Sequence, residues 1–150
     1  MRVVIQRVSD AQLTIDGSVF SQIGKGLMIL AGFEDSDTVD DIKWIAKKIT
    51  NLRIFDDENG NMNLSVDDID GEIMLVSQFT LHAKTKKGNR PSFIKSAKPE
   101  VAEPLYNQLI QEFDEIRKNK TKTGKFGTDM KINLTNTGPV TIFIDTKNKE

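Results

Sequence analysis

The stretch LMILAGF, residues 27–33, is an unbroken apolar run. The turn-forming segment Gly24-Lys25-Gly26 precedes it, and a polar stretch that starts at Glu34 follows it. A run of this length between turn signals is typical of a strand that is covered on both faces. We therefore expect residues 27–33 to form a central strand.

The residues before this run alternate between apolar and polar side chains. The alternation covers residues 2–8 and 11–16, which are rich in Val, Ile and Thr. Asp16-Gly17 is a hairpin signal, and residues 18–23 resume the strand pattern. Three short antiparallel strands are predicted here.

Two segments carry apolar residues at helical spacing. The first opens at residues 37–38, and its apolar positions are Val39, Ile42, Ile45, Ala46 and Ile49. The second covers residues 99–118, with Pro104 tolerated in its opening turns. We expect both segments to be amphipathic helices.

The remaining segments complete the predicted order of elements, β-β-β-β-α-β-α-β-β. Residues 51–64 indicate a hairpin with an acidic tip, residues 72–81 a strand with a buried centre, and residues 130–134 and 140–145 two final strands. This order favours an α/β fold with mixed, largely antiparallel sheets packed together and two helices on the outer side. We expect one domain over residues 1–150, with a frayed tail at residues 147–150.

The composition excludes several classes of protein. The 150 residues include no cysteine and one histidine, which argues against disulfides, a thiolate zinc site and a cysteine nucleophile. No stretch approaches the ~18 apolar residues of a membrane span, and the N-terminus lacks the apolar core of a secretory signal. We expect a cytoplasmic protein without a metal or other cofactor.

The net charge of −1 conceals two basic segments. Residues 83–99 hold six basic residues and no acidic one: Lys84, Lys86, Lys87, Arg90, Lys95 and Lys98. Residues 117–131 hold six more beside the single Asp129. Both segments are either solvated loops or a surface that faces phosphate groups.

The usual catalytic groups are scarce. His82 is the only histidine, and at the end of a predicted strand a structural role is the simpler interpretation. Two polar segments stand out in apolar surroundings: Ser77-Gln78-Phe79-Thr80 and Asn136-Thr137-Gly138-Pro139. Taken alone, the first can satisfy backbone groups at a strand end, and the second can be an ordinary turn.

Both segments nevertheless resemble, in this order and spacing, those of the D-aminoacyl-tRNA deacylase (D-tyrosyl-tRNA(Tyr) deacylase) family. The resemblance covers essentially the whole chain. Its motifs are MRVVIQRVSDAQLTIDG, IGKGL, NLRIFDDENGNMNLS, SQFTL, KKGNRPSF, GKFGTDMKINL and NTGPVTIFID.

The resemblance implies a homodimeric hydrolase that proofreads chirality during translation. Such an enzyme cleaves the ester between a D-amino acid, or glycine, and the terminal adenosine of tRNA, and it rejects L-aminoacyl-tRNA. The resemblance implies that Ser77, Gln78, Phe79 and Thr80 line the catalytic pocket. It also implies that Gly138-Pro139, with a cis peptide bond, reaches into the partner subunit's pocket and that its backbone excludes L side chains.

Other residues have expected roles around this pocket. Arg7 would brace the Gly-Pro loop, or else be an ordinary surface arginine, and Phe126 and Met130 would form apolar walls near the adenosine or simply belong to the core. The basic residues of segments 84–98 and 117–131 would face tRNA. Thr80 would be either the nucleophile or a group that positions water, with backbone N–H groups around Phe79 and Thr80 stabilising the oxyanion.

Two other functions fit parts of the sequence. One is a non-catalytic module that binds tRNA or ribosomal RNA. The scarcity of catalytic side chains favours this function, whereas the scarcity of aromatic residues argues against it, because proteins that bind single-stranded RNA stack its bases on aromatic rings. The other is a hydrolase of free D-amino acid esters or small peptides, which would not depend on tRNA.

Overall fold

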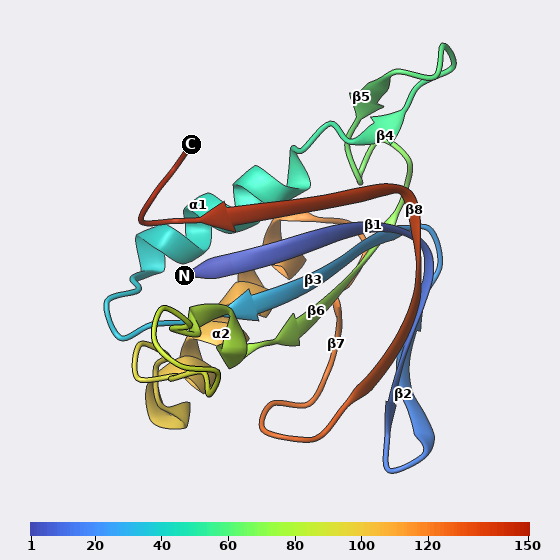
Figure 1. Cartoon of the computed structure of the whole chain (residues 1–150). Coiled ribbons are helices and arrows are strands. Elements are labelled where there is room, and N and C mark those ends of the chain that lie inside the picture. Colours follow the sequence, from blue (N-terminus) through green and yellow to red (C-terminus); the bar gives the residue numbers. More distant parts are fainter.

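The apolar run at residues 27–33 forms the central strand β3, as predicted (Figure 1). The computed structural model describes residues 1–150. The elements are β1 (Arg2–Ile15), β2 (Ser18–Ile23), β3 (Gly26–Gly32), α1 (Val39–Thr50), β4 (Phe55–Asp56), β5 (Met62–Leu64), β6 (Glu72–Ser77), the short 3-10 helix η1 (Phe79–His82), α2 (Pro99–Ile116), β7 (Lys122–Thr123) and β8 (Lys131–Asp145).

Strand β3 lies between β1, which is antiparallel to it, and β6, which is parallel to it. One face of β3 presents Leu27 and Ile29 to the larger core, which also contains side chains of both helices. The opposite face presents Met28 to a second core with Met74 and Val76 of β6. The fold class is therefore confirmed: a mixed, mostly antiparallel sheet with two helices on one face.

Strand β1 is longer than predicted, because residues 2–8 and 11–16 belong to one continuous strand. One edge of β1 pairs with β8, and the other pairs first with β3 and then with β2. Ser9 and Asp10 interrupt the alternation because both are exposed at the point where β1 leaves β3 and joins β2. At the far end of this curled sheet, Ser21 Oγ of β2 donates to the Thr123 carbonyl of β7 at 2.8 Å.

Both helices begin and end close to the predicted residues. Helix α1 is capped by Thr38, whose hydroxyl accepts from the backbone N–H of Asp41 while the Asp41 carboxylate accepts from the backbone N–H of Thr38. Pro99 occupies the first turn of α2, where its missing N–H costs no helical hydrogen bond. Neither helix is long and apolar enough to span a membrane.

Several boundaries correct the sequence predictions. Strand β6 ends at Ser77, and Leu81 lies in η1 rather than in the strand. The two strands predicted at residues 130–134 and 140–145 are one strand, β8, which starts at Lys131 and has a protrusion in its middle. Strand β7 was not predicted because it has only two residues.

The predicted frayed tail is also wrong. The Lys147 ammonium donates to the Asp41 carboxylate at 2.7 Å, and the Lys149 ammonium lies 4.3 Å from the centre of the Trp44 ring. The tail therefore packs along α1, although its sequence has the polar composition of a loose end.

The contact between β3 and β6 can be tested at Gly26. A Cβ atom there would overlap the Glu72 backbone oxygen and lie 2.7 Å from the Glu72 carbonyl carbon. We expect Gly26→Ala to lower the free energy of unfolding in urea by about 3 kcal/mol. Gly24→Ala is the control, because its Cβ would lie 3.6 Å from the flexible Glu72 carboxylate. Equal losses in both variants would contradict this packing.

Candidate active site

A cavity of about 600 Å³ opens at the carboxyl ends of the parallel strands β3 and β6. In sheets of this kind, ligands bind outside the carboxyl ends of parallel strands. The lining combines Ala31 and Phe33, residues 76–79, residues 96–99 with Phe93 and Ala102, and residues 128–130 with Phe126 and Ile132. Of the predicted site residues, the structure brings Ser77, Gln78, Phe79, Phe126 and Met130 together here.

The segment Ser77-Gln78-Phe79-Thr80 forms the turn from β6 into η1. The backbone N–H of Gln78 donates to the Ala31 carbonyl at 2.7 Å, which anchors the turn to β3. The Gln78 Nε2 group donates to Thr80 Oγ1 at 2.6 Å. Thr80 does not line the cavity, but it is bonded to Gln78, which does. The first hydrogen bond of η1 runs from the Leu81 N–H to the Gln78 carbonyl, so the N–H groups of Phe79 and Thr80 have no acceptor inside the helix.

Aromatic rings form the apolar wall of the cavity. Phe79 is 57% exposed and meets Phe93 edge to face, with ring centres 5.1 Å apart. Phe126 packs against Tyr106, whose hydroxyl donates to the Leu75 carbonyl at 2.7 Å. Burial raises the pKa of Tyr106, so this hydroxyl stays protonated and serves as a fixed donor behind the wall.

A strap formed by residues 93–97 crosses η1, and sequence reasoning missed it. Ser96 Oγ donates to the Phe79 carbonyl at 2.8 Å, and the Ala97 N–H donates to the Phe33 carbonyl at 2.9 Å. The one available signal was the apolar pair Phe93-Ile94 inside a mostly polar and basic loop. The strap holds the backbone of Phe79 from outside the strand.

The cavity lacks the groups of a conventional hydrolase. Its only charged lining residues are Lys98 and Asp129. His82 is 2% exposed, lies outside the cavity lining and has no hydrogen-bond partner on either ring nitrogen. No cluster of His, Asp and Glu residues suited to a metal ion is present.

The second polar segment protrudes from the middle of β8. Asn136 pairs with Val8 and Thr141 pairs with Gln6, so residues 137–140 all lie opposite Arg7. The Gly138-Pro139 peptide bond is cis, and both residues are exposed. Gly138 has a φ of +124°, and a Cβ atom there would lie 3.0 Å from the Arg7 guanidinium. Only glycine fits at this position without displacement.

Arg7 connects this loop to the segment after α1. Its Nε donates to the Thr137 carbonyl at 3.1 Å, and one Nη donates to the Ile54 carbonyl at 2.7 Å and to Asp56 at 3.1 Å. Arg7 is 8% exposed, so it is not a surface arginine. The predicted contact with a carbonyl of the Gly-Pro loop is present.

The cavity and the Gly-Pro loop lie at opposite ends of β3. Arg7 pairs with Leu27 at the start of β3, whereas Ala31 near its end lines the cavity. Four residues of strand separate the two positions by about 13 Å. One chain therefore does not bring Gly138 and Pro139 to its own cavity.

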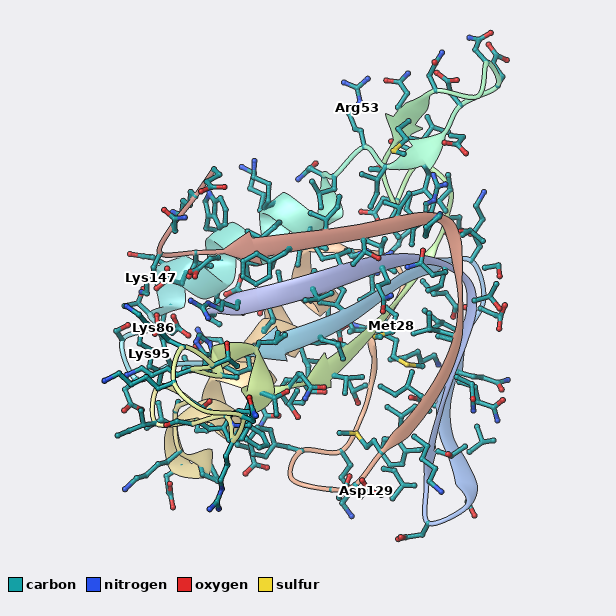
Figure 2. The ribbon with its side chains drawn as sticks, in the orientation of Figure 1. Met28, Arg53, Lys86, Lys95, Asp129 and Lys147 are labelled. Atoms are coloured by element: carbon teal, nitrogen blue, oxygen red, sulfur yellow. The ribbon has the colours of Figure 1, made fainter.

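The predicted basic residues lie in the loop before the strap. Lys84, Lys86, Lys87 and Arg90 are exposed, form no ion pair and do not line the cavity. Figure 2 shows Lys86 and Lys95 on the same side of the molecule. Backbone hydrogen bonds between Lys84 and Ser92 close the base of this loop.

Together, the fold and the cavity define a small α/β protein with an apolar pocket at a parallel strand pair and no nucleophile-base pair. The profile of the family described as D-Tyr-tRNA(Tyr) deacylase matches residues 4–145. The chain is 61% identical to a D-aminoacyl-tRNA deacylase of Parabacteroides distasonis and 60% identical to one of Flavobacterium psychrophilum, each over 100% of both chains. The chain therefore belongs to the D-Tyr-tRNA(Tyr) deacylase family.

Two solved structures share the fold. One, named c-Myc DNA Unwinding Element Binding Protein, is 39% identical with a TM-score of 0.92, and the match covers 97% of this chain and 98% of that one. The other is described as a probable eukaryotic D-amino acid tRNA deacylase and is 18% identical with a TM-score of 0.79, covering 95% of this chain and 97% of that one. At that identity, the second likeness concerns the fold alone.

The strap predicts a local effect of Ser96. We expect Ser96→Ala to lower the free energy of unfolding by about 1 kcal/mol and to speed amide exchange at Leu81 in η1, because the hydrogen bond to the Phe79 carbonyl is lost. Ser92→Ala is the matched control, because Ser92 lies in the same loop and its hydroxyl makes no hydrogen bond. Hydrogen exchange by NMR gives the answer, and the same exchange rate at Leu81 in both variants would refute the strap.

Proposed function

We propose that this chain hydrolyses the ester bond of D-aminoacyl-tRNA and releases the free D-amino acid and tRNA. The observation that carries the proposal is the cavity lined by Ser77, Gln78 and Phe79, in a chain that matches proteins named D-aminoacyl-tRNA deacylase over its full length. An apolar cavity with backbone donors suits an activated ester, which needs a placed water rather than a strong nucleophile.

The active enzyme is a homodimer in this proposal, with each Gly138-Pro139 loop completing the partner subunit's pocket. The separation of loop and cavity within one chain supports this arrangement. Strand β8 also has a free edge along 15 residues, and Phe143 on it is 57% exposed. The unpaired N–H and C=O groups of such an edge can form hydrogen bonds with a strand of a second chain. Each subunit is a single domain over residues 1–150, supported by the pairing of β1 with β8 at the two ends of the sequence.

Selection for D-amino acids follows from backbone contacts. Carbonyl oxygens of the Gly-Pro loop would accept from the α-ammonium group, while the ester carbonyl faces the N–H groups of Phe79 and Thr80. With both groups held, the remaining two positions on the α-carbon have set directions, and a backbone wall in the L direction excludes L side chains. Glycine has no side chain to exclude, so glycyl-tRNA is a substrate as well.

The chemical step uses water and the substrate's own ribose. Water adds to the ester carbonyl carbon, the bond to the 3′ oxygen breaks, and the proton from water reaches that oxygen with help from the adjacent 2′-hydroxyl. Thr80 acts as a positioning group rather than the nucleophile. Its Oγ1 already accepts from Gln78, and no histidine or carboxylate bonds to it as a base.

The basic residues outside the cavity supply tRNA affinity. Lys84, Lys86, Lys87 and Arg90 form one expected contact, and the exposed lysines of residues 117–131 form another. Arg117 was predicted to join them, but it is buried and bonded to Asp67 at 2.8 Å, so it does not face tRNA. Phe126 and Met130 are the apolar neighbours of the terminal adenosine. Because tRNA is the substrate, we propose a cytoplasmic location.

A non-catalytic nucleic-acid-binding module is the second candidate. The observation that favours it is the 39% identity to a structure whose name describes binding to a DNA unwinding element. It predicts binding of nucleic acid without release of any amino acid.

Hydrolysis of D-tyrosyl-tRNA beside L-tyrosyl-tRNA separates these functions. We expect rapid release of D-tyrosine, at least about 100-fold faster than release of L-tyrosine, with EDTA present to remove adventitious metal. Binding of tRNA without hydrolysis of either substrate would favour the second candidate. Equal rates on free D-tyrosine esters would indicate a hydrolase that does not depend on tRNA.

Replacement of Thr80 distinguishes its two roles. We expect Thr80→Ala to lower kcat less than about 100-fold, a loss typical of a positioning group, whereas a 2′-deoxy terminal adenosine lowers kcat far more. Single-turnover kinetics with saturating enzyme measures both. If Thr80→Ala abolishes chemistry while tRNA still binds, Thr80 is the nucleophile.

A further inference from the structure

A groove of about 560 Å³ at the C-terminal end of α1 is lined by positively charged residues. It shares no residue with the cavity, and its lining contains three cations and no carboxylate. The lining residues are Trp44, Lys47, Lys48, Asn51, Leu52 and Arg53.

The cations of this groove are not paired. Lys47, Lys48 and Arg53 are exposed and form no ion pair, in contrast to Lys147, which is bonded to Asp41 near the start of α1. The helix dipole favours cations in the last turn and so accounts for Lys47 and Lys48. It does not account for Arg53, which follows the helix and whose Nε donates to the Asn63 carbonyl at 2.8 Å.

The ring of Trp44 holds two ammonium groups beside these charges. The ring is partly exposed, and the ammonium groups of Lys48 and Lys149 lie 5.7 and 4.3 Å from its centre. Exposed cations without carboxylate partners are the groups by which proteins hold a nucleic-acid backbone. A phosphate-rich polymer fits this groove better than an apolar or basic partner.

The groove is joined to the Gly-Pro loop through Arg7. Arg53 directly precedes Ile54, and Arg7 bonds to the carbonyls of both Ile54 and Thr137. Figure 2 shows Arg53 and Asp129 of the cavity lining at opposite ends of the molecule. The Arg53 end of the groove therefore lies toward the Gly-Pro loop.

We propose that the groove at Trp44, Lys47, Lys48 and Arg53 binds the phosphate backbone of the tRNA whose 3′ end occupies the partner subunit's pocket. The inference rests on the proposed function and its dimer, in which the Gly-Pro loop enters that pocket and brings the groove beside it. One subunit then cleaves the ester while the other holds the body of the same tRNA.

Charge reversal tests the surface. We expect Lys47→Glu/Lys48→Glu to lower kcat/KM for D-tyrosyl-tRNA about tenfold and to reduce the slope of log kcat/KM against log salt by about two. Hydrolysis of D-tyrosyl-adenosine, which lacks the tRNA body, stays at the unmodified rate. Lys47→Gln/Lys48→Gln gives a smaller loss of the same kind and serves if the first variant unfolds. Unchanged kcat/KM and salt slope overturn the proposal, whereas no hydrolysis of either substrate by the unmodified chain overturns the proposed function.

Mixed dimers test the cross-subunit claim with identical composition and net charge. One subunit carries Ser77→Trp, which fills its pocket and is first checked to inactivate the homodimer. The charge reversals are placed either on that subunit or on the subunit with the open pocket, and each dimer is purified through two tags. We expect the tenfold loss only when the reversals lie on the subunit with the filled pocket. Equal loss in both dimers, or loss only in the other dimer, overturns the assignment.

Discussion

The burial of β3 on both faces is the constraint on which the rest of the structure depends. Leu27 and Ile29 require a cover on one face and Met28 on the other, so the helices occupy one side and the curled end of the sheet occupies the other. The parallel pairing of β3 with β6 follows, because α1 crosses over one face to connect them. The two ends of β3 are then different environments: the cavity lies at the carboxyl end, and the Gly-Pro loop lies at the amino end.

Local signals in the sequence were sufficient for the fold class, both helices and the central strand. The Thr38 cap and Pro99 mark helix starts by chemistry that acts within one turn. The predictions fail where contacts between residues far apart in the sequence determine the local structure. Ser9 and Asp10 look like a loop, but β8 pairs along the whole of β1 and keeps it extended. Lys147 and Lys149 look loose, but they contact Asp41 and Trp44, more than 100 positions away.

In the candidate site too, the features set by local sequence could be predicted and those set by distant contacts could not. The SQFTL and Gly-Pro segments stood out as polar residues in apolar surroundings, and the resemblance supplied their expected roles. The structure places each on a distinct turn. Ser96 and Arg53 could not be singled out from the sequence, because their importance comes from distant contacts. Ser96 bonds to the Phe79 carbonyl, and Arg53 bonds to the Asn63 carbonyl and lines the basic groove. Polar residues in loops acquire meaning only when the fold brings their partners near. Reasoning from one sequence therefore finds motifs better than it finds the residues that hold them.

The scarcity of catalytic side chains is consistent with the proposed recognition of the substrate by backbone groups. An enzyme that accepts many D-amino acids cannot depend on side-chain contacts, because each would favour one amino acid over another. Backbone groups avoid this problem, but they must be held rigidly, since the main chain has no rotamers with which to adjust. The Arg7 contacts at one end of β3 and the Ser96 strap at the other provide that rigidity. In the proposed mechanism, the residues that decide specificity are therefore those that fix the backbone, even where they never touch the substrate.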